Sequence, residues 1–237
     1  DFNGDGADDL AVYHPLVNPG AWYILPKGLS PVQLGTADEY PVPGDYNADG
    51  YADAVVFNRI SAVWRGNSVL NGIFSMNLQW GYAGVWPVSG DFNGDGETDL
   101  AVYDPNVGNW YIRTRSGTAL AWNLNWGFKG GIPAPGDYNG DGATDLAIYH
   151  RHTGKWYIRT LSGTVLAWNK NFGFKKGWPV PGDYNGDGAT DLAVYHRAVG
   201  RWYIATLQGT AIAWGKQFGF PAAQPVPGDF NGDGKAD

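Results

Sequence analysis

The sequence contains no cysteine among its 237 residues. This absence excludes a disulfide framework, a thiolate metal site and a cysteine nucleophile, so an exported chain of this kind needs another staple, such as bound metal. No apolar run approaches the ~18 residues of a membrane-spanning helix, and we expect no membrane insertion in this chain. No segment places its apolar residues at the 3.6-residue period of a helix either, which favours β-structure.

Acidic residues are scarce outside one recurring nonapeptide. Six copies carry acids at positions 1, 5 and 9, and these positions hold 18 of the 23 acidic residues. Outside the nonapeptides only Asp38, Glu39 and Asp104 are acidic. The formal net charge of −7 argues against nucleic acid as a partner. Carboxylates crowded into short loops repel one another, which indicates a bound cation.

The nonapeptide marks a tandem repeat. Its first residues are spaced by 44 and then four times by 46, and residues 137–182 agree with residues 183–228 at 32 of 46 positions. We therefore read residues 1–237 as one domain of repeated units. These units are 1–44, 45–90, 91–136, 137–182, 183–228 and the partial unit 229–237.

Each unit predicts four short strands. In the unit 137–182, "LAIYH", "KWYIRT" and "VLAWN" are rich in large apolar residues and are separated by turns containing glycine. The stretch "WPVPGDY" is extended, and its prolines exclude a helix. Four strands in about 46 residues, repeated about five times, predict an all-β fold, a β-propeller of four-stranded blades. We expect five blades, with the C-terminal extended strand completing a first blade formed by residues 9–40; the alternative is part of a six- to eight-bladed ring.

The nonapeptide D-x-N-G-D-G-x-x-D predicts a metal site. Side-chain oxygens at positions 1, 3, 5 and 9, with the carbonyl at position 7, form the hard, all-oxygen set that suits Ca²⁺. Glycines at positions 4 and 6 permit the positive φ angles that fold a chain around an ion. An EF-hand would need Glu at position 12, where this chain has valine or isoleucine. The alternative interpretation is a solvated turn of hydrogen-bonded Asp and Asn side chains.

We expect five or six Ca²⁺ ions, one in each loop. The candidate ligands at positions 1, 3, 5, 7 and 9 are Asp1, Asn3, Asp5, Ala7 and Asp9; Asp45, Asn47, Asp49, Tyr51 and Asp53; Asp91, Asn93, Asp95, Glu97 and Asp99; Asp137, Asn139, Asp141, Ala143 and Asp145; Asp183, Asn185, Asp187, Ala189 and Asp191; and Asp229, Asn231, Asp233, Lys235 and Asp237.

These loops, the preceding "FGFKKGWPVPGD" and the following "DLAVY" resemble the FG-GAP/VCBS repeats of integrin α-subunit propellers and of bacterial surface proteins. The resemblance covers essentially the whole chain. It implies Ca²⁺ in a loop between the first two strands of each blade, and an extracellular setting, either secreted or at a cell surface. The units here are shorter and richer in tryptophan, closer to the bacterial form, so integrin partners are not carried over.

Most tryptophans occupy fixed positions of the repeat. One strand position holds Trp22, Trp64, Trp110, Trp156 and Trp202, and another holds Trp122, Trp168 and Trp214. A residue used once per blade is typical of packing between blades, and we predict that role for both sets. The residue before "PVPGD" instead varies from tyrosine to isoleucine to glutamine, which a core site would not tolerate. Trp86 and Trp178, at this position, are therefore predicted to be exposed and to contact a ligand.

A second candidate set lies at the end of the strand after each loop. His14, His150 and His196 recur there and can line one face of the blades, where they would contact a ligand. The alternative is a set of strand-end turns in water. We expect no catalysis, because almost all carboxylates lie in the metal loops, and the sequence has no G-x-S-x-G motif.

The functional prediction is a calcium-stabilised extracellular recognition or adhesion propeller with lectin-like binding of a glycan or polysaccharide. One alternative is a propeller that binds a cell-surface protein or has a structural role in a larger surface protein. The other is an accessory domain of a secreted carbohydrate-active enzyme.

Overall fold

The computed structural model describes residues 1–16, 19–25, 31–70 and 74–237. The described residues form strands and turns without a helix. Accordingly, this part of the chain has no helix that is long and apolar enough to span a membrane.

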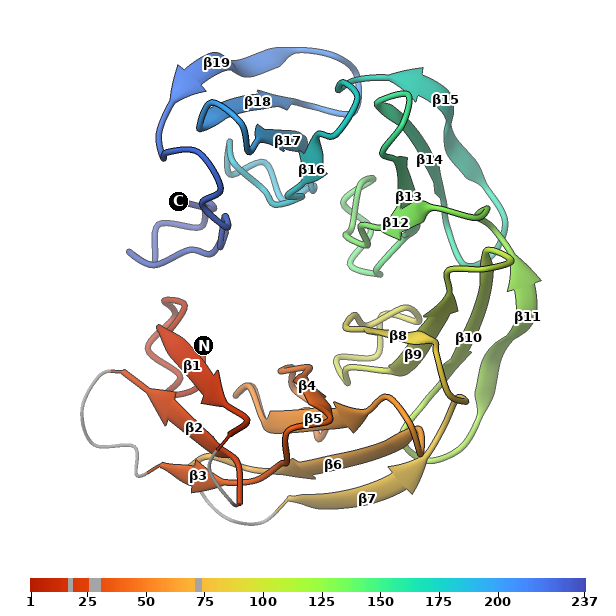
Figure 1. The fold of residues 1–237 in the computed structure, drawn as a ribbon, viewed down its shortest axis with the longest axis vertical. Coiled ribbons are helices and arrows are strands. Elements are labelled where there is room, and N and C mark those ends of the chain that lie inside the picture. The colour runs from red at the N-terminus through yellow and green to blue at the C-terminus, as the bar shows by residue number, and fades with distance from the viewer. Residues whose placement is uncertain (17–18, 26–30, 71–73) are drawn as a thin grey trace. The chain divides into compact units, whose positions relative to one another are not determined.

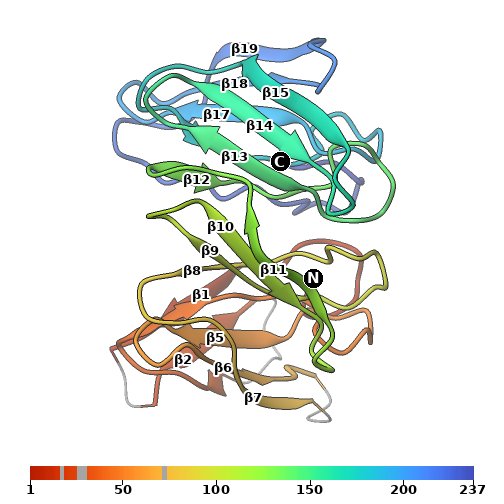
Figure 2. The same ribbon diagram turned by 90° about the vertical axis from the view of Figure 1, so that its right-hand side faces the viewer.

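The strands form five antiparallel sheets, and neighbours along the chain are neighbours within each sheet (Figures 1 and 2). The first sheet contains β1 (Ala11–His14), β2 (Ala21–Ile24) and β3 (Val32–Gln33). The second contains β4 (Glu39–Pro41), β5 (Ala54–Asn58), β6 (Val63–Asn67) and β7 (Ser75–Gln79). The third contains β8 (Trp86–Val88), β9 (Leu100–Asp104), β10 (Asn109–Arg113) and β11 (Ala119–Asn125).

The last two sheets repeat this order. The fourth contains β12 (Gly131–Pro133), β13 (Leu146–His150), β14 (Lys155–Arg159) and β15 (Val165–Asn171). The fifth contains β16 (Trp178–Pro179), β17 (Leu192–His196), β18 (Arg201–Ala205) and β19 (Ala211–Gln217). Successive four-stranded meanders are the blades of a propeller, so the predicted all-β, five-bladed β-propeller is confirmed.

The first blade differs from the other four. Its sheet holds three strands among the described residues, in the order β1-β2-β3. The segment 224–229, which the sequence offers as its fourth strand, is not assigned to a strand. Closure by pairing of the terminal strands therefore stays a prediction.

The described residues divide into two compact units. Unit 1 comprises residues 1–91, 95–104 and 110–124, and unit 2 comprises residues 92–94, 105–109 and 125–237. In each unit the second strand of a blade is buried along most of its length, as in β13, where Leu146, Ala147, Ile148 and Tyr149 are fully buried. Along the third strand, buried residues alternate with partly buried ones, so that one face of the strand contributes a row of apolar side chains to the core.

The cores lie between consecutive blades. In unit 1 a cluster around Trp64 and Phe57 of the second blade includes Leu100 and Val102 of the third. In unit 2 the cluster around Trp156 of the fourth blade includes residues of β17 in the fifth. Buried side chains thus bind blade to blade, and the loops and outer strands are left to form sites.

Candidate functional site

The nonapeptide loops connect the first and second strands of a blade. Loop 137–145 lies between β12 and β13, and the N–H groups of Gly140 and Gly142 donate to the two carboxylate oxygens of Asp137 at 2.7 Å each. Both glycines have positive φ, 72° and 89°. The side chain at position 1 therefore organises the loop, and the glycines allow the curvature it needs. At the equivalent of Gly140, Ala48 adopts a φ of 55°.

The carboxylate at position 9 is buried in four loops. Asp53, Asp99, Asp145 and Asp191 expose 1–2% of their surface. The pKa of Asp53 is raised to about 7, mainly by burial and also by the charges of Asp49 and Asp45, while a hydrogen bond from the Tyr46 N–H and the charge of Arg115 oppose this rise. The same causes raise the pKa of Asp145 and of Asp191 to about 6.

The donor chemistry of each loop fits a divalent cation. Asp45, Asp49 and Asp53 lie close enough for their charges to interact, and such mutual repulsion is relieved by a bound cation. In the part of the chain that the structure describes, however, no three acidic or histidine side chains are grouped in a geometry ready to hold a metal. At position 3 of the second loop, Asn47 Nδ2 donates to Asp49 Oδ2 at 3.0 Å. This hydrogen bond engages one of the carboxylate oxygens that would coordinate an ion.

Successive loops are joined through their backbones. The N–H at position 8 of one loop donates to the carbonyl at position 1 of the loop before it. Within unit 1 this bond runs from Ala52 to Asp1 at 2.8 Å and from Thr98 to Asp45 at 2.6 Å. Within unit 2, Thr190 makes the same contact with Asp137. The candidate metal loops therefore form linked rows rather than independent turns.

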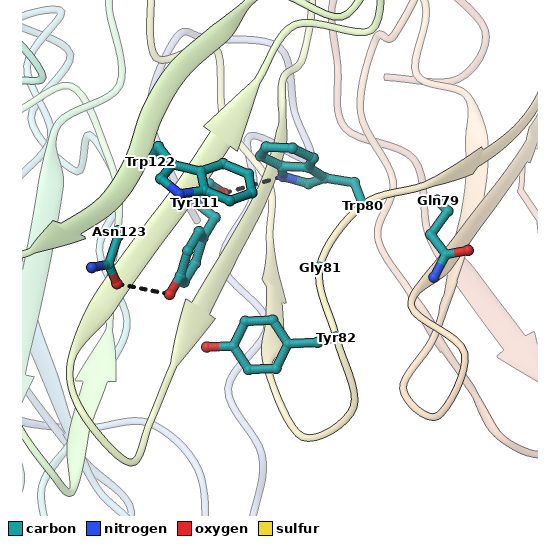
Figure 3. A pocket seen from close by; sticks show the side chains of 7 residues that line it. All are labelled: Gln79, Trp80, Gly81, Tyr82, Tyr111, Trp122 and Asn123. Carbon is teal, nitrogen blue, oxygen red and sulfur yellow. Dashed lines mark hydrogen bonds between the residues drawn. The ribbon is translucent and has the colours of Figure 1, made fainter.

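An aromatic pocket lies in unit 1, between the β7–β8 connection and the outer strands of the third blade (Figure 3). Its volume is about 340 Å³. The rings of Trp80, Tyr111 and Trp122 meet edge to face, with Trp122 5.7 Å from Trp80 and 5.6 Å from Tyr111. Tyr82 lies 5.6 Å from Tyr111, and Asn123 accepts a hydrogen bond from the Tyr111 hydroxyl at 2.8 Å. The remaining lining residues are Gln79 and Gly81.

The pocket holds polar groups at fixed positions among its apolar rings. The Trp80 indole N–H donates to the Tyr111 carbonyl at 3.3 Å, and the Tyr82 hydroxyl donates to Asp104 Oδ2 at 2.5 Å. These hydrogen bonds lock the orientations of the rings. Flat apolar faces with a few oriented polar groups are the features of a site for a small, partly apolar ring such as a pyranose.

Unit 2 contains two similar rows of contacting rings, each of which we call an aromatic ladder. In the first, Trp168 and Phe128 each lie 5.3 Å from Tyr157, and Phe128 lies 4.7 Å from His150. The second ladder has Trp214 and Phe174 at 5.4 and 5.2 Å from Tyr203, and Phe174 stacks on His196 at 4.6 Å. Histidine thus replaces Asp104 at the end of both ladders in unit 2.

The outer strands of unit 2 carry a bulge beside the ladder tryptophan. In the fourth blade Trp156 pairs with Lys170 but Ile158 pairs with Ala167, so β15 carries one extra residue there. Asn169, in this stretch, has a φ of 58°. Trp168 follows the buried Ala167 and therefore faces the opposite side of the sheet, with 67% of its surface exposed.

The structure separates the two predicted tryptophan sets. Trp22, Trp64, Trp110 and Trp156 are buried, which confirms their packing role, and Trp202 is half-buried. The prediction of packing was wrong for the outer-strand set, whose members expose 70, 67 and 73% of their surface at Trp122, Trp168 and Trp214. Each also lies near an aromatic ring from the connection before its blade, with ring centroids 5.7, 5.5 and 6.4 Å apart.

The variable tryptophans have different outcomes. Trp86 is 42% exposed, as predicted. Trp178 is half-buried, so its predicted exposure holds only in part. The reason is that the guanidinium groups of Arg151 and Arg197 stack on its ring, at 6.0 and 5.4 Å from the centroid.

The histidines differ as well. His14 is exposed, whereas His150 and His196 are half-buried members of the ladders. Burial, with the charges of His152 and Lys155, lowers the pKa of His150. The ladder positions represented by Trp80, Tyr82 and Tyr111 were missed by sequence reasoning. The signal for Trp80 and Tyr82 is the aromatic–glycine–aromatic triplet "WGY", "WGF" or "FGF" that precedes the first strand of a blade, whereas Tyr111 follows the buried tryptophan of the third strand.

Comparison with known proteins gives a family and a fold. The family model of the FG-GAP-like repeat matches residues 91–148, 137–194 and 183–237, which together cover more than half of the chain. No curated protein sequence matches the chain significantly.

Two solved structures share the architecture. An Agrocybe aegerita lectin, described as recognising non-reducing terminal N-acetylglucosamine, is 14% identical with a TM-score of 0.63, over 98% of this chain and 76% of the lectin. BBS1N, solved in complex with ARL6DN, is 15% identical with a TM-score of 0.52, over 90% of this chain and 62% of BBS1N. At such identities the likeness shows the fold alone.

Proposed function

This chain belongs to the family of FG-GAP-like repeat proteins, and from that premise we propose that it is a calcium-stabilised, extracellular module that binds glycans. The observation that supports glycan binding is the pocket formed by Trp80, Tyr82, Tyr111 and Trp122. The lectin that shares the fold is consistent with this proposal, because it shows that such a propeller can carry a sugar site.

The exposed face of Trp122 is the central element of the proposed site. An indole with 70% of its surface in water at the edge of a pocket is costly for the fold alone, and covering it with a pyranose ring removes apolar surface from water. The neighbouring Asn123 and Gln79 amides can donate to or accept from sugar hydroxyls. The pocket therefore combines stacking for affinity with hydrogen bonds for orientation.

Binding without catalysis is part of the proposal. Of the acids outside the loops, Glu39 forms an ion pair with Arg65, and Asp104 accepts the hydrogen bond from Tyr82. These carboxylates are already engaged, and glycoside hydrolysis normally requires two that face a scissile bond.

A glycan array followed by calorimetry tests the proposal. We expect binding to at least one class of pyranose-containing glycan in the presence of calcium. Trp122→Ala should weaken this binding at least tenfold, whereas Trp86→Ala, which removes an exposed tryptophan outside the pocket, should not. An array without any bound glycan would overturn the proposed function. Equal effects of the two substitutions would show that this pocket is not the glycan-binding site.

The calcium component rests on the loops. Six loops each offer three carboxylates, an asparagine and a backbone carbonyl. Burial, with the charges of Asp49 and Asp45, raises the pKa of Asp53, and a bound cation would favour its ionised form instead. Elemental analysis of protein purified without chelator should find five or six calcium ions per chain. Magnesium or zinc in their place would contradict the proposal.

A further inference from the structure

The structure carries a second ligand property, which deepens the proposed glycan-binding function and rests on it. The cations of the chain are concentrated away from its acids. Residues 105–228 contain 12 lysine and arginine residues, and within this range every aspartate lies in the loops 137–145 and 183–191. No glutamate occurs there at all. Once the loop charges are neutralised by cations, this part of the molecule is strongly basic.

The aromatic ladders of unit 2 end at these cations. His150 and His196 close the two ladders, and each is followed directly by an arginine, Arg151 and Arg197. In the third blade the corresponding residues are Asp104, the end of the unit 1 arrangement, and Pro105. The same aromatic arrangement therefore has an acidic end in one unit and a basic end in the other.

The two arginines meet at one tryptophan. Arg151 follows β13 in the fourth blade, Arg197 follows β17 in the fifth, and both guanidinium groups lie over the ring of Trp178 at the start of β16. Lys176, two residues before Trp178, donates its backbone N–H to the Arg151 carbonyl at 2.9 Å. The backbone of Lys176 therefore lies beside that of Arg151.

Neither arginine forms an ion pair with any residue that the structure describes. Arg197 donates to the Ala222 carbonyl at 3.4 Å, and its Nε is buried without a hydrogen-bond partner among those residues. Stacking on an indole holds guanidinium groups in place without neutralising them. Both guanidinium carbons lie within 6.0 Å of the same ring centroid, and two positive charges gathered at one place attract an anion.

We propose that the cluster of Arg151, Trp178 and Arg197 binds the carboxylate of an acidic polysaccharide whose neighbouring sugar rings lie on the aromatic ladders of unit 2. Guanidinium groups pair bidentately with planar carboxylates, which gives direction as well as charge. The ladders favour a glycan over nucleic acid as the polyanion, because their exposed tryptophans Trp168 and Trp214 stand singly at blade edges, as sugar platforms do.

The test compares two probes with one backbone: a hyaluronan decasaccharide and its carboxyl-reduced, uncharged form, titrated into the calcium-loaded protein. We expect at least tenfold tighter binding of the acidic probe, and a loss of this preference in Arg151→Gln/Arg197→Gln. The matched control Lys170→Gln/Lys216→Gln removes the same charge from β15 and β19 and should keep the preference. Melting curves of both double variants verify folding.

The outcomes separate this inference from the proposed function. Equal affinity for the two probes, or a glycan array that binds neutral glycans only, would overturn the acidic site and leave glycan binding intact. An array without any bound glycan would overturn both. Duplex DNA that binds as tightly as the acidic probe, with the same dependence on Arg151 and Arg197, would overturn the choice of a glycan as the partner.

Discussion

The backbone N–H of Thr190 donates a 2.6 Å hydrogen bond to the carbonyl oxygen of Asp137. Asp137 is the first residue of one loop, and Thr190 is the eighth residue of the next. Thr190 also directly precedes Asp191, whose buried carboxylate accepts the Tyr184 N–H at 3.0 Å. A single peptide contact thus connects the candidate metal ligands of two blades, and a change in one loop reaches the other through it.

This contact predicts coupling between neighbouring loops. Asp137→Asn weakens the organisation of its own loop, because the side chain that accepts the Gly140 and Gly142 N–H groups loses its charge. We expect the variant to lose its own calcium ion and to bind the ion of loop 183–191 several-fold more weakly. Calcium titration with a count of bound ions checks this. Asp38→Asn, outside the loops, is the control, and loss of a single ion with unchanged affinity of the others would show that the loops are independent.

Chelation should lower the stability of the whole fold. A ligand that binds only the folded state stabilises it by about 2.7 kcal/mol per site at a hundredfold excess over Kd. For a chain of this size each kcal/mol corresponds to roughly 2–4 °C in Tm. Excess EDTA should therefore lower the Tm by many degrees, and added calcium should restore it. An unchanged melting curve in EDTA would show that bound calcium does not stabilise the fold.

The metal-free protein should lose stability as the pH rises. The pKa of Asp53 is about 7 and the pKa values of Asp145 and Asp191 are about 6, whereas the ordinary value for an aspartate is 3.8. The folded state therefore holds these protons more tightly than the unfolded state. Their contribution to stability is complete below about pH 4 and is lost as the pH rises through 6 and 7. Calcium binding needs the carboxylates, so its affinity should fall over the same range as the pH decreases.

Two measurements check this pH dependence. The Tm of EDTA-treated protein should decrease between about pH 5 and pH 8, and calcium affinity at about pH 5.5 should be lower than at about pH 7.5. A metal-free Tm that rises over this range would show that burial of these carboxylates is not the dominant effect.

Two tryptophans of the fourth blade should respond in opposite ways to truncation. Trp156 is fully buried and donates its indole N–H to the Phe172 carbonyl at 2.6 Å. Trp156→Ala should cost about 3–5 kcal/mol of unfolding free energy. Trp168 is 67% exposed, and Trp168→Ala should cost less than about 1 kcal/mol while weakening glycan binding. Denaturant melts of the two variants test this order, and a larger loss for Trp168→Ala would contradict the assignment of core and site.

Much of the fold was predictable because the repeat constrains it. A unit of about 46 residues with four strand signals has few architectures available, and Trp64, Trp110 and Trp156 lie where a once-per-blade core residue should. The exposure of Trp122 and Trp168 was not predictable in the same way. Each follows a buried alanine in the outer strand, Ala121 or Ala167, and so faces the opposite side of the sheet, and the sequence pattern alone does not say which side of an outer strand is covered.

The environment of Trp178 was beyond sequence reasoning for a different reason. The variable position correctly indicated a residue outside the invariant core. Its partners Arg151 and Arg197 lie 27 residues before it and 19 after it, at the ends of strands in two blades. Only the packing of one blade against the next brings them to the same ring.

The hydrogen bonds between successive loops join main-chain atoms, so they form with alanine at position 8, as in Ala52, or with threonine, as in Thr98. This has a consequence for the gene. A segment that encodes one unit can be duplicated or removed in phase, and the new junction is rebuilt by the same contact whatever side chains meet there. Recombination can then change the length of such a protein in steps of one blade, and the 32 identical positions of 46 in adjacent units are consistent with a recent step of this kind.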